Sequence, residues 1–107
     1  MYRGISKEQL TLPAGFSADG KKMVPLRDVL APEKPTLEFF QLTPEQQADI
    51  TAARIARQRK YKMGMVGGGV IDKERAIAEV KARSDIGRVL VEIEQRTIQM
   101  LKKKAEG

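Results

Sequence analysis

Proline is confined to the first part of this chain of 107 residues. Four of the five prolines lie within residues 1–43, and the fifth is Pro44. Proline fixes its own φ angle and cannot donate a backbone hydrogen bond, so it interrupts both helices and sheet ladders. The apolar residues of 1–43 also follow no helical period. We therefore expect a mainly α fold, in which an extended N-terminal arm (1–43) precedes a helical region (44–107).

A β-hairpin is an alternative within the arm. Residues 9–12 and 23–26 flank a connection that contains Asp19-Gly20, a pair that tolerates the positive φ angles of hairpin turns. Against a hairpin, Pro13 and Pro25 each remove a donor from the ladder, and the connection is longer than a tight hairpin loop. The sequence leaves both the hairpin and an irregular arm open.

A helix start is encoded at Thr43-Pro44-Glu45-Gln46. Thr43 can accept a hydrogen bond from the amide of Gln46, the Gln46 side chain can reach back, and Pro44 occupies the first helical position. Alanines favour the helix beyond this cap, and we expect it to stop near Met63-Gly64. The sequence thus predicts a helix over about 44–63.

The glycine-rich stretch 64–69 predicts a loop, because consecutive glycines lose the most backbone entropy on ordering. Asp72 can then cap a further helix. No proline follows, so one helix from Asp72 to Lys104 is conceivable, but the phase of the apolar residues argues for a break near Ser84-Asp85. Gly87 weakens a helix at that point. We expect two helices, about 72–83 and 85–104.

The last helix has an unusually wide apolar arc. One face carries the main apolar stripe, and Val91 and Ile98 lie on a flank shared with Gly87, which widens the arc to roughly 200°. A single neighbouring helix would not cover that arc, so this helix is either central in its own domain or packs against another chain. The main stripe consists of Ile86, Val89, Leu90, Ile93, Thr97, Met100 and Leu101.

The arm also carries large apolar side chains that need to be buried somewhere. Two of the three phenylalanines fall in the segment 36–42, which has no regular period of its own. We interpret these anchors, together with the flank of the last helix, as contacts to a partner protein. The predicted partner-interface residues are Phe16, Phe39, Phe40, Gly87, Val91 and Ile98.

Composition argues against catalysis. The chain contains no Cys and no His, which removes thiolate nucleophiles, imidazole bases, disulfides and the usual zinc clusters. Glu92 and Glu94 are two residues apart and would point to different faces of a helix, so they do not form a carboxylate pair. We expect no enzymatic activity, no metal, no cofactor and no small-molecule substrate.

Positive charge is densest in residues 42–64, which carry five basic and two acidic side chains, within a chain of net charge +6. Such a helix face could contact phosphates and stack a base on its tyrosine. It could equally be a solvated face or bind an acidic protein, since cations are favoured near a helix C-terminus. The candidate nucleic-acid contacts are Arg54, Arg57, Arg59, Lys60, Tyr61 and Lys62.

No apolar run approaches the roughly 20 residues that a membrane-spanning helix needs. The first residues also lack the apolar region of a signal peptide. We expect a cytoplasmic protein, or one within a particle assembled there, with no membrane partner.

These features lead to the hypothesis of a non-catalytic structural or assembly protein. It would act through contacts with a protein partner or with further copies of itself, as a small subunit of a larger complex such as a viral particle or a multi-subunit machine. One alternative is a nucleic-acid-binding module that uses the basic helix face. Another is a small regulatory protein that occludes a site on a second protein. No motif in the sequence is long enough to identify a family.

Overall fold

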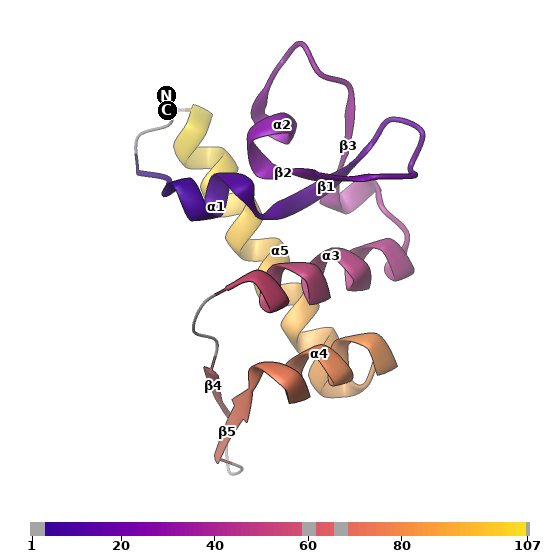
Figure 1. The fold of residues 1–107 in the computed structure, drawn as a ribbon, viewed down its shortest axis with the longest axis vertical. Coiled ribbons are helices and arrows are strands. Elements are labelled where there is room, and N and C mark those ends of the chain that lie inside the picture. The colour runs from indigo at the N-terminus through magenta and orange to yellow at the C-terminus, as the bar shows by residue number, and fades with distance from the viewer. Residues whose placement is uncertain (1–3, 59–61, 66–68, 107) are drawn as a thin grey trace.

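A computed structural model describes residues 4–58, 62–65 and 69–106 (Figure 1). The helices are α1 (Lys7–Thr11), α2 (Leu26–Leu30), the 3-10 helix η1 (Phe39–Gln41), α3 (Pro44–Arg57), α4 (Lys73–Ala82) and α5 (Asp85–Glu106). The strands are β1 (Pro13–Ser17), β2 (Met23–Pro25), β3 (Thr36–Glu38), β4 (Lys62–Met65) and β5 (Gly69–Asp72). The prediction of a mainly α fold is confirmed.

The N-terminal sheet contains the hairpin that the sequence left open. Its strand order is β2-β1-β3, with both pairs antiparallel. Pro13 is the first residue of β1 and lies opposite Pro25, the last residue of β2, and the register shifts between Pro13 and Gly15. The two prolines are tolerated because they face each other at a strand end beside this irregularity, where a ladder donor is not needed.

The turn between β1 and β2 is held by local hydrogen bonds. The Ser17 hydroxyl donates to Asp19 Oδ1 at 2.6 Å, and the Lys21 amide donates to the same oxygen at 3.0 Å. Gly20 supplies a positive φ of 75°. The Ser17 hydrogen bond, followed by that of the Lys21 amide, lowers the pKa of the Asp19 carboxyl below its ordinary value. These contacts explain how a connection longer than a tight loop still closes a hairpin.

The N-terminal segment carries several short elements in addition to the hairpin. It contains α1, α2, η1 and the three-stranded sheet, and Ser6 caps α1 by accepting a hydrogen bond from the Gln9 amide at 3.1 Å. Each of these elements is only three to five residues long. Such short elements show no hydrophobic period, and this is why the sequence pattern predicted an irregular segment.

Helix α3 begins as predicted and ends earlier. The Gln46 amide donates to Thr43 Oγ1 at 3.1 Å, and the Thr43 amide donates to Gln46 Oε1 at 3.0 Å, so the capping box is present. The helix ends at Arg57 rather than near Met63. Residues 62–65 instead form β4, which pairs with β5, so backbone pairing replaces the expected end of the helix. Residues 66–68 of the predicted glycine loop lie outside the described residues.

The two C-terminal helices match the prediction closely, as Lys73–Ala82 and Asp85–Glu106. Asp72 caps α4 by accepting a hydrogen bond from the Arg75 amide at 2.9 Å. Arg83 adopts the left-handed conformation with φ 54°, and the Gly87 amide donates to Ser84 Oγ at 3.0 Å. These local features turn the chain sharply between α4 and α5.

Helix α5 runs along most of the molecule and joins two groups of buried side chains (Figure 1). It contributes Ile98 and Leu101 to the first group, which we call the sheet core, and Leu90 to the second, the helix core. Val91 packs against both. The sheet core consists of Ile5, Ala14, Phe16, Leu26, Phe39, Leu42, Ile50, Ile98 and Leu101. The helix core consists of Ala48, Ala52, Ile55, Ile71, Ala76, Val80 and Leu90.

The buried face of α5 is rotated relative to the predicted stripe. Its buried residues are Gly87, Leu90, Glu94, Ile98 and Leu101. Val89 and Met100, which the sequence pattern assigned to the main apolar stripe, are 54% and 50% exposed. The apolar arc of α5 is therefore only partly covered by the rest of the chain. The edge that stays exposed is that of Val89 and Met100, whereas Ile98, on the flank that we expected to need a partner, is buried.

We expect Gly87→Ala to destabilise the fold. A Cβ at this position would overlap the carbonyl of Glu79 and lie 2.9 Å from the Cα of Val80, and both are backbone atoms that cannot rotate away. Overpacking of this kind costs about 1–3 kcal/mol. Urea denaturation should show a loss of that size, although alanine is intrinsically the better helix former by about 1 kcal/mol. A variant with unchanged stability would show that α4 and α5 do not approach this closely.

Candidate functional site

The Arg54 side chain is fully buried and makes three hydrogen bonds inside the molecule. Its Nε donates to Glu94 Oε1 at 3.1 Å, with which it forms an ion pair. Its Nη1 donates to the Pro13 carbonyl at 3.0 Å, and its Nη2 donates to Gln9 Oε1 at 3.0 Å. The side-chain Nε2 of Gln58 also donates to Glu94 Oε1, at 3.2 Å. This arrangement joins α1, β1, α3 and α5, so Arg54 is a structural residue.

The structure corrects the predicted basic helix face. Arg54 offers no guanidinium to a phosphate, because it is buried, and α3 ends at Arg57, which is exposed. Lys62 lies in strand β4 rather than on the helix. The other three candidates, Arg59, Lys60 and Tyr61, lie outside the described residues. Arg54's partners Glu94 and Gln9 are 40 and 45 positions away in the sequence, so no local pattern indicated its burial.

The predicted partner-interface residues divide into two groups. Phe16, Phe39 and Ile98 are buried in the sheet core, which corrects the expectation that another chain covers them. The reason is that the N-terminal segment folds against the C-terminal half of α5. Phe40 is 66% exposed. Gly87 and Val91 come together at a cleft, which we take as the candidate functional site.

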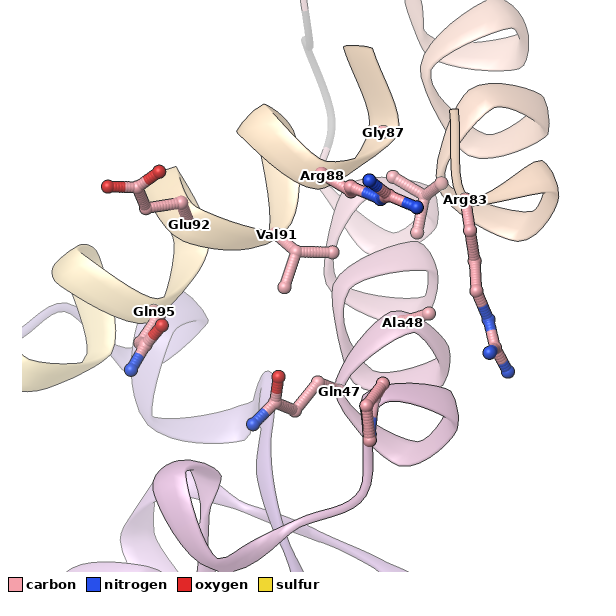
Figure 2. A pocket seen from close by; sticks show the side chains of 10 residues that line it. Gln47, Ala48, Arg83, Gly87, Arg88, Val91, Glu92 and Gln95 are labelled. Atoms are coloured by element: carbon pink, nitrogen blue, oxygen red, sulfur yellow. The ribbon is translucent and has the colours of Figure 1, made fainter. Parts of the chain in front are cut away.

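The cleft lies between the start of α3, the end of α4 and the first half of α5, and has a volume of about 630 Å³. Figure 2 shows Val91 pointing into it and Gln47 reaching toward it from α3. The fully buried lining residues are apolar, whereas the half-buried and exposed ones are mostly polar. The buried or half-buried apolar lining is formed by Ala48, Val80, Gly87 and Val91. The rest of the lining is formed by Pro44, Gln47, Arg83, Arg88, Glu92 and Gln95.

Positive charge gathers on one side of this cleft. Arg83 and Arg88 are both exposed, and Figure 2 shows their guanidinium groups on the side of α4. Neither arginine forms an ion pair with any residue that the structure describes. Glu92, on the other side, is paired with Arg96 at 2.6 Å. A ligand in the cleft would therefore meet an apolar surface beside two available cations.

The polar lining of the cleft is formed by three kinds of side chain. The lining contains two guanidinium groups, two side-chain amides and one carboxylate, which is held by Arg96. Within residues 4–58, 62–65 and 69–106, no group of three or more acidic side chains could hold a metal ion. None of the helices in the described part of the chain is long and apolar enough to cross a membrane.

Comparison of the chain with protein-family models, with curated proteins and with solved structures finds no match. What the cleft binds therefore has to be inferred from its own side chains. The sequence pattern predicted Gly87 and Val91 as partner contacts, and the two arginines lie beside them only because α4 and α5 fold back on each other. Arg83 and Arg88 lie on either side of the predicted helix break near Ser84-Asp85. Their positions there are the sequence feature that could have indicated two arginines at the cleft.

We expect Arg54→Met to cost about 3–5 kcal/mol of the free energy of unfolding, because it leaves the Glu94 carboxylate buried without its cation. Arg96→Met is the matched control: it breaks an exposed pair whose side chains are 75% and 57% accessible, and should cost less than about 1 kcal/mol. Urea denaturation of both variants gives the comparison. Equal losses in the two would show that the Arg54–Glu94 pair does not hold the fold together.

Proposed function

We propose that this protein is a non-catalytic assembly subunit that binds another protein through the cleft between α3, α4 and α5. The observation that carries the proposal is the combination of an apolar lining with two exposed arginines in one open cleft. A protein segment with an apolar side chain next to Asp or Glu fits this combination. Small subunits of viral particles or of multi-subunit machines work through such contacts.

The apolar part of the cleft would supply binding free energy. Val91 is half-buried, and Ala48 and Val80 beneath it are already withdrawn from water. An apolar side chain placed against them loses its own hydrated surface, at about 25 cal/mol per Å².

The arginines would supply specificity. A guanidinium group can hold a carboxylate through two parallel hydrogen bonds, and arginine is enriched among the residues that dominate protein interfaces. Arg83 is the C-cap of α4 and Arg88 lies in the first turn of α5, so the turn between these helices fixes the two backbones relative to each other. An acidic partner segment is therefore favoured over a basic one.

Two features support a role without catalysis or cofactor. The chain has no His and no Cys, and the single carboxylate that lines the cleft is engaged by Arg96. A phosphate-bearing partner such as DNA or RNA could also contact two arginines, but it would gain little from the apolar lining. The loss of Arg54 from the surface also weakens the nucleic-acid alternative.

The proposal predicts that peptides selected from a random displayed library contain an apolar residue flanked by Asp or Glu. Binding of these peptides should fall at least about tenfold when Arg83→Glu and Arg88→Glu are combined, since the loss of charge pairing costs about 1.4 kcal/mol or more. The pair Lys7→Glu and Arg27→Glu is the matched control, because it reverses two exposed charges away from the cleft. Fluorescence anisotropy with labelled peptides gives the affinities.

Two results would overturn the proposal. One is peptide binding that is equally weakened by the control pair, since that would reflect net charge alone. The other is salt-sensitive binding of a labelled DNA or RNA oligonucleotide together with no selected peptide, which would assign the arginines to phosphate recognition.

A further inference from the structure

An uncovered apolar seam follows helix α5. Val89 and Met100 are 54% and 50% exposed, and Ile93 is half-buried beside them. Ile86 is also half-buried, and one side of it packs against the helix core. Positions 86, 89, 93 and 100 follow the three- and four-residue spacing of a helix that packs against a second helix in coiled-coil fashion. Exposed apolar side chains scattered singly need no explanation, but a row of them at this spacing does.

Apart from Arg88, which lines the cleft, the charged residues next to the seam are sorted by sign along α5. Asp85 and Glu92 lie in its N-terminal half, and Arg96 and Lys103 lie in its C-terminal half. All four are exposed. At about 100° per residue they fall on the solvent side of the seam, away from the buried face that contains Glu94. The seam thus has an acidic half and a basic half.

We propose that the α5 seam is an interface between two copies of this chain, with the two helices antiparallel. In that arrangement Val89 of each copy meets Met100 of the other. The same register brings Glu92 opposite Arg96 and Asp85 opposite Lys103, each twice. A parallel arrangement would place Arg96 against Arg96, so like charges disfavour it.

The surface of the C-terminal half also has a shape that fits this register. A shallow depression there is lined by residues 96, 99, 100 and 103, together with Lys102 and Glu106. The spacing of the first four, namely i, i+3, i+4 and i+7, is that of a hole which receives one side chain from a facing helix. In the antiparallel register, Val89 of the second copy lies over this depression.

The seam extends over residues 85–103, which is about 27 Å of helix at 1.5 Å per residue. A single helix pair of this length buries an area near the lower limit for a specific interface, about 1,200 Å² in total. We therefore expect a dimer that dissociates on dilution. Glu92, beside the seam, also lines the cleft, but Val89 and Met100 do not line it, and Arg83 and Arg88 do not lie on the seam.

Sedimentation equilibrium of the purified chain tests the association. The expected mass rises from 11.9 kDa at low concentration to twice that value at high concentration. Val89→Asp combined with Met100→Asp should abolish the rise, while circular dichroism stays unchanged because both positions are exposed. Val70→Asp is the matched control: Val70 is 62% exposed on β5, and the dimer should persist in this variant.

The orientation is tested by cross-linking, which the absence of native cysteine makes simple. Val89→Cys mixed with Met100→Cys should cross-link through a short thiol-reactive reagent, and neither variant alone should do so. A chain that stays monomeric at every concentration, or a dimer that survives the paired Asp substitutions, overturns the proposal. Cross-linking of either cysteine variant with itself would overturn the antiparallel arrangement. None of these substitutions removes a cleft arginine, so these results and those of the peptide experiment are read independently.

Discussion

The ion pair between Arg54 and Glu94 is the contact on which the rest of the structure depends. Removing two charges from water is costly, and their mutual attraction offsets that cost only when other hydrogen bonds complete both groups. Here Pro13, Gln9 and Gln58 supply those bonds. Among the described residues, no buried side-chain nitrogen or oxygen is left without a partner. The pair lies between elements of the sheet core and the helix core, and so ties the N-terminal segment to the helices.

This contact also fixes the rotation of α5 about its own axis. With Glu94 directed toward Arg54, residues 90, 98 and 101 point into the two cores. Val91 then falls beside the cleft, and Val89 and Met100 fall on the solvent side. Both surfaces to which we assign partners are thus consequences of where one buried carboxylate points.

The parts of the fold that could be predicted are those with local signals. The capping box at Thr43, the cap at Asp72 and the break near Ser84 depend on residues within a few positions of each other, and all three are present. The rotation of α5 could not be predicted in this way. Its buried face includes Glu94, which a hydrophobic pattern assigns to solvent and whose partner Arg54 lies 40 positions away in the sequence. It also includes Gly87, which packs against α4 across a sharp turn. At the candidate site the apolar pattern of α5 indicated Gly87 and Val91 as partner contacts, which stays a prediction, and gave no signal for the arginines that the turn between α4 and α5 brings beside them.

The cleft and the seam meet at Glu92, and its contacts decide whether both can be occupied together. In one copy Glu92 is held by Arg96 of its own helix. In the antiparallel pair Arg96 of the second copy approaches the same carboxylate, so the charge beside the cleft stays neutralised when the seam closes. Both side chains are also exposed beforehand, and little desolvation opposes the exchange. A partner held by Arg83 and Arg88 would therefore meet the same cleft in the monomer and in the dimer, which suits a subunit that makes two kinds of contact at once.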